Sequence, residues 1–309
     1  MLAKMLSRTL VLATVAASFA TAAYAAPKIA VVTPYLSQPG TQFYVEAFQA
    51  AAKTNGWDVN VVDTQGDVAA VISRLEDVVN QKVDAIVINV DPSQVQAGLQ
   101  AAKDAKIPVF GMDAGNDPLL VANVTSNGYS MAAQTAAYVA DRIGGAGNIV
   151  MFTFDAFPPV HARDVVADAV FSNYPDIKVL QRVTPDVTDG GIADSRAKMD
   201  AILAANPKPG SIKAVWCAWD QPALGVLQSI EAAGRQNEGI VITGMDANPQ
   251  ARDAIAKKGN FEVSMAQDFT GIGQATADAV KKVLGGDTLK THTIYVPTKL
   301  ITADNVNDK

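Results

Sequence analysis

The sequence contains one cysteine and two histidines. A single cysteine cannot form a disulfide within the chain, and it excludes metal sites built from paired cysteines. Cys217 lies in the apolar run 214–218, which predicts a buried, small hydrophobic side chain. His161 and His292 give little basis for a catalytic triad or a metal cage, so we expect no cofactor and no metal.

The sequence also lacks the motifs of common enzyme classes. The loop after the first predicted strand has no G-x-G-x-x-G, and neither a Walker phosphate loop nor a G-x-S-x-G occurs in the chain. The glycine-rich segment 144–147 precedes a predicted strand instead of following one, which is typical of a connecting turn. These absences favour a binding protein over an enzyme.

Positive charge is sparse, since the net charge is −6 and no basic cluster occurs anywhere in the chain. This composition argues against nucleic acid as a partner.

Long apolar runs are absent except at the start of the chain. Lys4 and Arg8 give a positive beginning, 9–22 is uncharged and apolar, and 23–25 reads Ala-Tyr-Ala, a small-x-small cleavage site. The run is shorter than the roughly 20 residues that a spanning helix needs. We therefore expect 1–25 to be a cleaved signal peptide. No cysteine follows the cleavage site, so we expect no lipid anchor and a freely soluble mature protein.

From Lys28 onward, short β-branched runs alternate with longer helical patterns, which is typical of strand-helix-strand units and mainly parallel sheets. The alternation restarts after a long helical stretch at 130–143, so the sequence predicts an α/β fold of two similar lobes, each a mainly parallel sheet flanked by helices. Predicted strands are 29–32, 59–62, 85–89, 109–112, 122–124, 148–152, 178–183, 214–218, 240–243 and 262–266. Predicted helices are 43–55, 68–81, 94–106, 161–173, 193–204, 223–233, 249–258 and 273–284.

Ligands bind beyond the carboxyl ends of the strands in open parallel sheets. Polar side chains directly after predicted strands are Asp91, Asp113, Asp220, Asp246 and Gln267, together with the loop 35–41. Carboxylates accept hydroxyl protons and flat rings cover apolar ligand faces, so this mixture suits a polyhydroxylated ligand. Each aspartate could instead cap the following helix, an alternative favoured for Asp91 before Pro92 and left open for Asp113 and Asp246.

Two further side chains stand out by position. Arg163 lies early in a predicted helix, where the macrodipole disfavours a cation, so it is either a ligand contact or an ordinary surface arginine. Trp216 and Trp219 are three residues apart, so their rings should face opposite sides of a strand or its end. One ring could lie in the core and the other in the site, although simple packing of both is equally compatible with the pattern.

Four local patterns follow one another along the chain: 29–32 (Ile-Ala-Val-Val), 107–113 (Ile-Pro-Val-Phe-Gly-Met-Asp), 219–225 (Trp-Asp-Gln-Pro-Ala-Leu-Gly) and 244–246 (Gly-Met-Asp). Their order and spacing resemble the sugar-binding members of the type I periplasmic binding protein family, from Lys28 to about Leu300. The resemblance implies a periplasmic protein that closes its lobes around a ligand by hinge bending and presents it to a membrane permease.

The resemblance also implies site residues. Asp113 matches a first-lobe aspartate that accepts hydroxyl protons, Arg163 a second-lobe arginine that donates to sugar oxygens, Asp246 a second-lobe aspartate, and Gln267 a hinge-side glutamine. Trp219 is the fifth expected ligand contact.

The chain departs from ribose-type relatives in two places. The loop 37–41 reads Ser-Gln-Pro-Gly-Thr where those relatives carry an asparagine and two aromatics, and Trp219 replaces a common asparagine. Ribose itself is therefore in doubt. We expect Gln38 and Tyr35 to contact the ligand from this loop, while Phe43, Phe154 and Phe157 could provide substitute packing.

The family pattern predicts three strands crossing between the lobes near Asn127, Asp268 and Ile294. The first lobe would comprise 26–126 and 268–293, and the second 127–267 and 294–309. The expected partners are a small neutral sugar or polyol and the permease of an ABC importer, with a chemoreceptor left open, and the protein is expected to be a monomer. The alternative ligand is a non-sugar signal such as autoinducer-2. A DNA-binding regulator of the same fold is disfavoured because the N-terminus forms a signal peptide.

Overall fold

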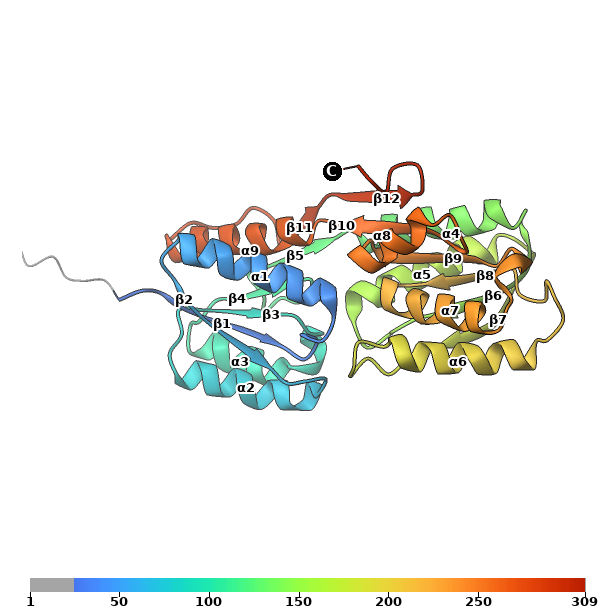
Figure 1. Ribbon diagram of the computed structural model, residues 1–309. Coiled ribbons are helices and arrows are strands. Elements are labelled where there is room, and N and C mark those ends of the chain that lie inside the picture. Colours follow the sequence, from blue (N-terminus) through green and yellow to red (C-terminus); the bar gives the residue numbers. More distant parts are fainter. Residues whose placement is uncertain (1–24, 309) are drawn as a thin grey trace, which may run out of the picture.

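The computed structural model describes residues 25–308, which form two α/β lobes side by side (Figure 1). All of the predicted signal peptide except Ala25 lies outside the described residues. Each lobe has one six-stranded sheet with helices on both faces, as the alternating sequence pattern predicts.

The first lobe is built on a parallel sheet in the order β2-β1-β3-β4-β5-β11. Its strands are β1 (Lys28–Thr33), β2 (Asp58–Asp63), β3 (Ala85–Ile88), β4 (Val109–Met112), β5 (Ala122–Ser126) and β11 (Thr293–Val296). Its helices are α1 (Pro39–Thr54), α2 (Val68–Asn80), α3 (Gln96–Asp104) and α9 (Phe269–Leu284), with a short 3-10 helix η1 (Pro92–Gln94).

The second lobe has the order β7-β6-β8-β9-β10-β12, parallel except for the antiparallel pair β10 and β12. Its strands are β6 (Ala146–Phe152), β7 (Asp176–Val183), β8 (Ala214–Cys217), β9 (Val241–Asp246), β10 (Phe261–Gln267) and β12 (Thr298–Thr302). Its helices are α4 (Gly128–Arg142), α5 (Pro158–Ser172), α6 (Ile192–Ala205), α7 (Asp220–Ala232) and α8 (Pro249–Ala256), with a 3-10 helix η2 (Gln236–Glu238).

The chain passes between the lobes after β5, after β10 and between β11 and β12 (Figure 1). The third passage differs from the prediction, which assigned residues from Ile294 onward to the second lobe. Ile294 pairs with Val124 in the first sheet, and this pairing continues to Val296. Pro297 follows, and since proline has no N–H to continue a ladder, the change of sheet occurs there.

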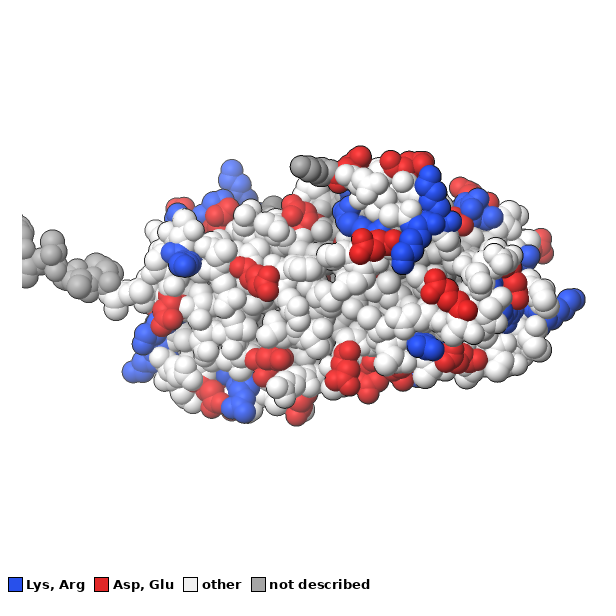
Figure 2. Space-filling view, in the orientation of Figure 1, with Lys and Arg blue, Asp and Glu red and all other residues white. Residues whose placement is uncertain are grey.

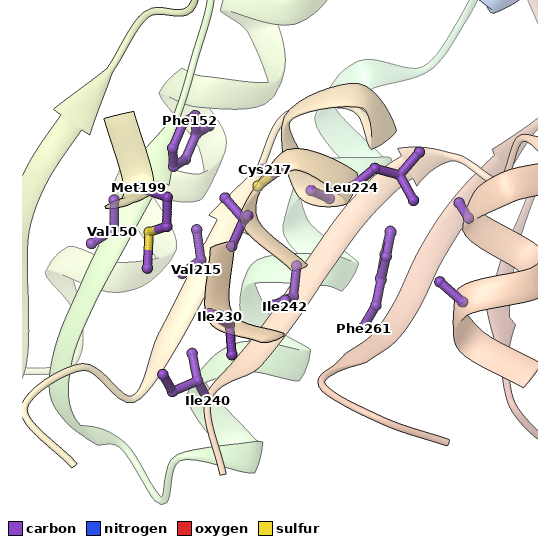
Figure 3. Packing of buried hydrophobic residues seen from close by; sticks show 14 of the residues in the cluster. Val150, Phe152, Met199, Val215, Cys217, Leu224, Ile230, Ile240, Ile242 and Phe261 are labelled. Atoms are coloured by element: carbon purple, nitrogen blue, oxygen red, sulfur yellow. The ribbon is translucent and has the colours of Figure 1, made fainter. Parts of the chain in front are cut away.

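Four apolar cores cover the four sheet faces. In the first lobe, α1 and α9 pack on one face and α2 and α3 on the other. In the second lobe, α4 and α5 pack on one face and α6, α7 and α8 on the other (Figure 3). Cys217 lies in this last core and is fully buried, which confirms its prediction as a small buried hydrophobe.

Acidic and basic side chains are interspersed over both lobes on the face in Figure 2. Exposed pairs such as Arg74 with Asp77 and Lys299 with Asp308 are each worth about 0 to 1 kcal/mol. Stability therefore comes mainly from the four cores. Between residues 25 and 308, no helix combines the length and apolar character that a membrane crossing needs.

Candidate functional site

A cavity of about 70 Å³ lies between the lobes, at the carboxyl ends of the parallel strands. All seven side chains predicted from the sequence line it, namely Tyr35, Gln38, Asp113, Arg163, Trp219, Asp246 and Gln267. Both lobes contribute to the wall, so the cavity exists as a unit only when the lobes are together. The role of these residues in ligand binding stays a prediction.

Asp113 follows β4 and is held by side chains of the first lobe. Its backbone has φ 53°, in the left-handed region that non-glycine residues seldom adopt. Asn89 secures this conformation by donating from Nδ2 to the carbonyl oxygens of Met112 (3.0 Å) and Asp113 (2.9 Å). Thr125 donates its hydroxyl to Oδ1 of Asp113 at 2.6 Å. The carboxylate is thus fixed before any ligand arrives.

Asp246 ends β9 in the second lobe and also has a positive φ, of 112°, followed by φ 48° at Ala247. The Ala247 N–H donates to Oγ of Ser264 (2.9 Å), and that hydroxyl donates to Oδ1 of Asp220 (2.6 Å). Oδ2 of Asp220 accepts from the N–H of Asn248 at 2.8 Å. Asp220, a sequence candidate for ligand contact, is fully buried and anchors this loop instead.

Each of the two Gly-Met-Asp segments therefore holds one aspartate in a fixed position, one segment in each lobe. Backbone outside the favoured regions costs of order 1 to 3 kcal/mol per residue and persists where the surroundings enforce it. A Cβ on Gly111 would collide with Asn123, and a Cβ on Gly244 with Asp220. Each glycine admits the polar side chain that anchors its loop. Neither aspartate caps the next helix, because Asn127 caps α4 and Asn248 caps α8.

Arg163 lies in the second turn of α5, which begins at Pro158 and not at residue 161 as predicted. The helix therefore extends further toward its N-terminus, and the argument from the macrodipole is weaker than the sequence indicated. The guanidinium is 3% exposed, donates from Nη1 to the Ala218 carbonyl oxygen (2.7 Å) and lies 3.7 Å from Oδ1 of Asp246. This burial excludes the alternative that Arg163 is an ordinary surface arginine.

Aromatic rings form another part of the wall. Tyr35 from the first lobe contacts Phe157 (centroids 5.2 Å apart) and Phe154 (6.3 Å), and Phe154 contacts Trp219 (6.2 Å), all edge to face. Trp216 instead lies in the core and donates from Nε1 to Thr135 (3.0 Å). The two tryptophans are thus divided between core and cavity wall, one of the two arrangements that their spacing allowed.

Three buried polar atoms in the lining have no hydrogen-bond partner among residues 25–308: the Tyr35 hydroxyl, Nε of Arg163 and Oε1 of Gln267. Gln267 donates from Nε2 to Oδ1 of Asp246 at 2.7 Å. Because a carboxylate only accepts, this contact fixes which end of the amide is the free acceptor. Buried polar groups are normally hydrogen-bonded, so these atoms are suited to a ligand.

Direct hydrogen bonds also join the lobes beside the cavity. Gln38 donates from Nε2 to the Val187 carbonyl oxygen at 3.2 Å, and Gln94 donates from Nε2 to the Ala156 carbonyl oxygen at 3.0 Å. Val187 lies in the loop after β7, which the strand-end rule would also have selected but which carries no distinctive sequence. The closed arrangement is therefore held partly by contacts that do not involve a ligand.

Burial raises the pKa of both lining aspartates. The pKa of Asp246 rises to about 6, because burial outweighs the opposing effects of Arg163 and Gln267. Burial likewise raises the pKa of Asp113 against Arg163 and the Thr125 hydrogen bond. Burial also raises the pKa of Asp220 well above its ordinary range, and the neighbouring Asp246 adds to the effect.

These shifts predict an unusual dependence of stability on pH. A carboxyl with a raised folded pKa binds protons more readily in the folded state, so its contribution to stability is lost as pH rises from about 4 through about 6. We expect the ligand-free protein to melt at a higher temperature at pH 5.5 than at pH 7.5. Scanning calorimetry across this range tests it, and Asp246→Asn should flatten the dependence. A melting temperature that falls on acidification to pH 5.5 would contradict the assignment.

The remaining sequence candidates lie elsewhere. Asp91 caps η1 by accepting from the Ser93 N–H (2.9 Å), with Pro92 at the first helical position, as the capping interpretation predicted. Of the lining that α1 and α9 provide, 39–41 lie in the loop 35–41 selected from the sequence, whereas Tyr44, inside a predicted helix, and Phe269, ahead of the predicted helix 273–284, were missed. Among the described residues, no group of three or more His, Cys, Asp or Glu side chains could hold a metal ion.

Comparisons with known proteins agree with this architecture. The xylitol-binding protein of Mycolicibacterium smegmatis is 30% identical over 280 residues, which cover 85% of this chain and 73% of the relative. The ribose import binding protein of Bacillus subtilis is 30% identical over 262 residues, covering 83% and 81%. An ABC transporter solute-binding protein from Agrobacterium vitis, solved with bound allitol, superposes with a TM-score of 0.86 at 29% identity, covering 92% and 97%.

A family model described as a periplasmic binding protein domain matches residues 29–288, nearly all of both lobes. The match spans the two Gly-Met-Asp segments, the arginine of α5 and the passages after β5 and β10. The chain therefore belongs to the periplasmic binding protein family, whose members bind solutes for ABC importers.

Proposed function

We propose that the protein binds a small sugar or sugar alcohol between its lobes and delivers it to the permease of an ABC importer. The observation that carries the proposal is that two fixed carboxylates and a buried guanidinium, drawn from both lobes, meet at one small cavity. A carboxylate accepts from two hydroxyl groups and a guanidinium donates to several oxygens, so together they match neighbouring hydroxyls on a carbon chain or ring. Relatives described as binding xylitol, ribose and allitol support this class of ligand.

The protein works in the periplasm after removal of the signal peptide, acts as a monomer, and carries out no catalysis. Ligand binding stabilises the closed arrangement of the lobes, since only that arrangement completes the cavity. The permease then recognises the closed form. A chemoreceptor could recognise the same closed form.

A thermal-shift screen of the mature protein tests the ligand class. Protein that has been unfolded and refolded, to remove carried-over ligand, is screened against pentoses, hexoses, their alditols and autoinducer-2. A ligand at a thousand times its dissociation constant should stabilise the folded state by about 4 kcal/mol. A strong shift with a sugar or alditol supports the proposal. A shift with autoinducer-2 alone, or with none of the compounds, would refute it.

Removal of the Gln94 hydrogen bond between the lobes should weaken ligand binding, although Gln94 lies outside the cavity. Gln94 does not line the cavity, and Gln94→Ala removes this contact between the lobes together with a longer hydrogen bond to Asp91 (3.3 Å) within the first lobe. A hydrogen bond of this kind is worth about 0.5 to 1.5 kcal/mol, so ligand affinity should fall by about two- to tenfold, through faster dissociation. Titration calorimetry and stopped-flow dissociation measure both. Gln100→Ala on α3, whose side chain bonds only Asp104, is the control, and equal effects of the two variants would contradict the prediction.

A further inference from the structure

Both backbone groups of Ala247, the residue after Asp246, are held by side chains. Its N–H donates to Oγ of Ser264, and its carbonyl oxygen accepts from Nε of the half-buried Arg252 at 3.0 Å. Ala247 has φ 48°, a conformation that a non-glycine residue keeps only where its surroundings enforce it. Arg252 therefore helps to hold the loop in the shape that directs Asp246 into the cavity.

The position of Arg252 is unfavourable for its charge. It is the fourth residue of α8, which begins at Pro249, so it lies near the positive end of the helix macrodipole. Its side chain makes two hydrogen bonds, both to backbone carbonyl oxygens: from Nε to Ala247, and from Nη1 to Val306 at 3.2 Å. A planar guanidinium can donate in two directions at once, so Arg252 bridges the loop after β9 to the end of the chain.

The tail that receives this bridge, residues 303–308, is itself firmly attached. Asn305 accepts from the Thr302 N–H at 2.8 Å and donates from Nδ2 to the Leu300 carbonyl oxygen at 2.9 Å. Val306 is 7% exposed and belongs to the apolar core under α8. Chain ends are ordinarily loose unless they are tied down in this way. The tail can therefore act as a support for the loop.

The same C-terminal segment also supports the second partner of Asp246. β12 is the last strand of its sheet and pairs with β10, where Thr298 lies opposite Gln267. Gln267 donates to Oδ1 of Asp246 at 2.7 Å. Residues 298–308 thus hold both the loop of Asp246 and the strand of Gln267, although none of them lines the cavity.

We infer that residues 298–308 form a brace that fixes Asp246 in its ligand-binding position, and that Arg252 is the positioning residue that connects this brace to the loop after β9. The inference rests on the proposed function, because it takes Asp246 as a ligand contact. Loss of the Arg252 bridge frees the Ala247 carbonyl group, and the loop then relaxes toward a favoured backbone conformation. The Asp246 carboxylate moves away from Arg163 and gains access to water, so ligand binding weakens and the pKa of Asp246 returns toward its ordinary range.

Arg252→Met tests the brace, because methionine keeps an apolar side chain but donates no hydrogen bond. We expect ligand affinity to fall by about threefold or more, as titration calorimetry with the ligand found in the screen measures. Arg252→Lys keeps the charge but lacks the planar fork, so it should retain part of the affinity. Lys299→Met is the control, because Lys299 lies on β12 and its side chain pairs with the exposed Asp308 instead of the loop. Its affinity should equal that of the unmodified protein.

A measurement without ligand separates the positioning of Asp246 from general support of the lobe. The raised pKa of Asp246 is expected to make the unmodified protein melt at a higher temperature at pH 5.5 than at pH 7.5. Arg252→Met should reduce this difference by about half or more, whereas a merely structural loss lowers both melting temperatures equally. The other charged groups near Asp246 are Arg163, Asp113 and Asp220, and the substitution leaves all three in place.

The outcomes distinguish the brace from the function on which it rests. A loss of affinity below about threefold in Arg252→Met, or a melting difference reduced by less than about half, overturns the inference and leaves the proposed function standing. If no sugar or alditol binds the unmodified protein, the proposed function fails. The melting comparison then decides by itself whether the brace positions Asp246.

Discussion

Arg163→Ala is expected to weaken ligand binding by about thirtyfold to several thousandfold. The guanidinium is 3% exposed and is the only lining cation among residues 25–308, so its loss leaves Asp113 and Asp246 unpaired in a closed cavity. Truncating one partner of a buried, hydrogen-bonded charge pair costs about 2 to 5 kcal/mol, which corresponds to this range of affinities. Titration calorimetry with the ligand found in the screen measures it.

The size of the effect needs a control for charge and a control for position. Arg163→Lys keeps the charge but loses the planar fork, so it should recover only part of the affinity. Arg196→Ala, on the exposed side of α6, removes the same chemical group far from the cavity and should bind as the unmodified protein does. Asp113→Ala should lose at least tenfold. Unchanged affinity in both Arg163→Ala and Asp113→Ala would place the ligand elsewhere.

Gly273→Ala is expected to destabilise the first lobe by more than about 2 kcal/mol. A glycine inside a helix is ordinarily improved by alanine, by about 0.5 to 1 kcal/mol. At this position in α9, however, a Cβ would overlap the backbone of α1 at Tyr44 and Phe48. Overpacking of this kind forces two helices apart and costs about 1 to 3 kcal/mol or more. The close approach therefore reverses the sign that helix propensity alone predicts.

Thermal unfolding measures this difference, and a loss of several degrees in melting temperature is expected. Gly259→Ala is the control, because nothing lies within 4 Å of a Cβ there and its φ is not positive. Gly225→Ala should resemble Gly273→Ala, since its Cβ would overlap the backbone of α6 at Ile192. A Gly273→Ala protein at least as stable as the parent would show that α1 and α9 adjust freely.

The two lining aspartates were accessible from the sequence because each stands at the end of a strand with a recognisable pattern. Asp113 and Asp246 stand at equivalent positions after Gly-Met, and the strand-end rule places them together. Their backbone conformation was not accessible, because positive φ at an aspartate depends on anchors such as Asn89, directly after β3, and Ser264 on β10. Local sequence does not encode such distant contacts.

Asp220 illustrates the limit of the rule. It stands at the start of α7, two residues beyond the end of β8, yet its carboxylate is buried and holds the loop after β9. Nothing in its immediate sequence distinguishes an anchor from a ligand contact. Likewise, the predicted boundary at 293/294 assigned 294–296 to the second lobe and no strand was predicted there, because only the pairing with β5 shows that these residues belong to the first sheet. Lobe membership near the end of the chain is a tertiary property.

The late return of the chain to the first lobe has a consequence for how the protein folds. The core beneath α1 takes Phe269, Ile272 and Val280 from α9, and the sheet gains β11 only at residues 293–296. After synthesis of the first 126 residues, the first lobe therefore still lacks α9 and β11, and part of its apolar core is exposed. Contacts between such distant segments form slowly, because a long loop must close first. The first lobe can therefore complete its core only after almost the whole chain has been synthesised.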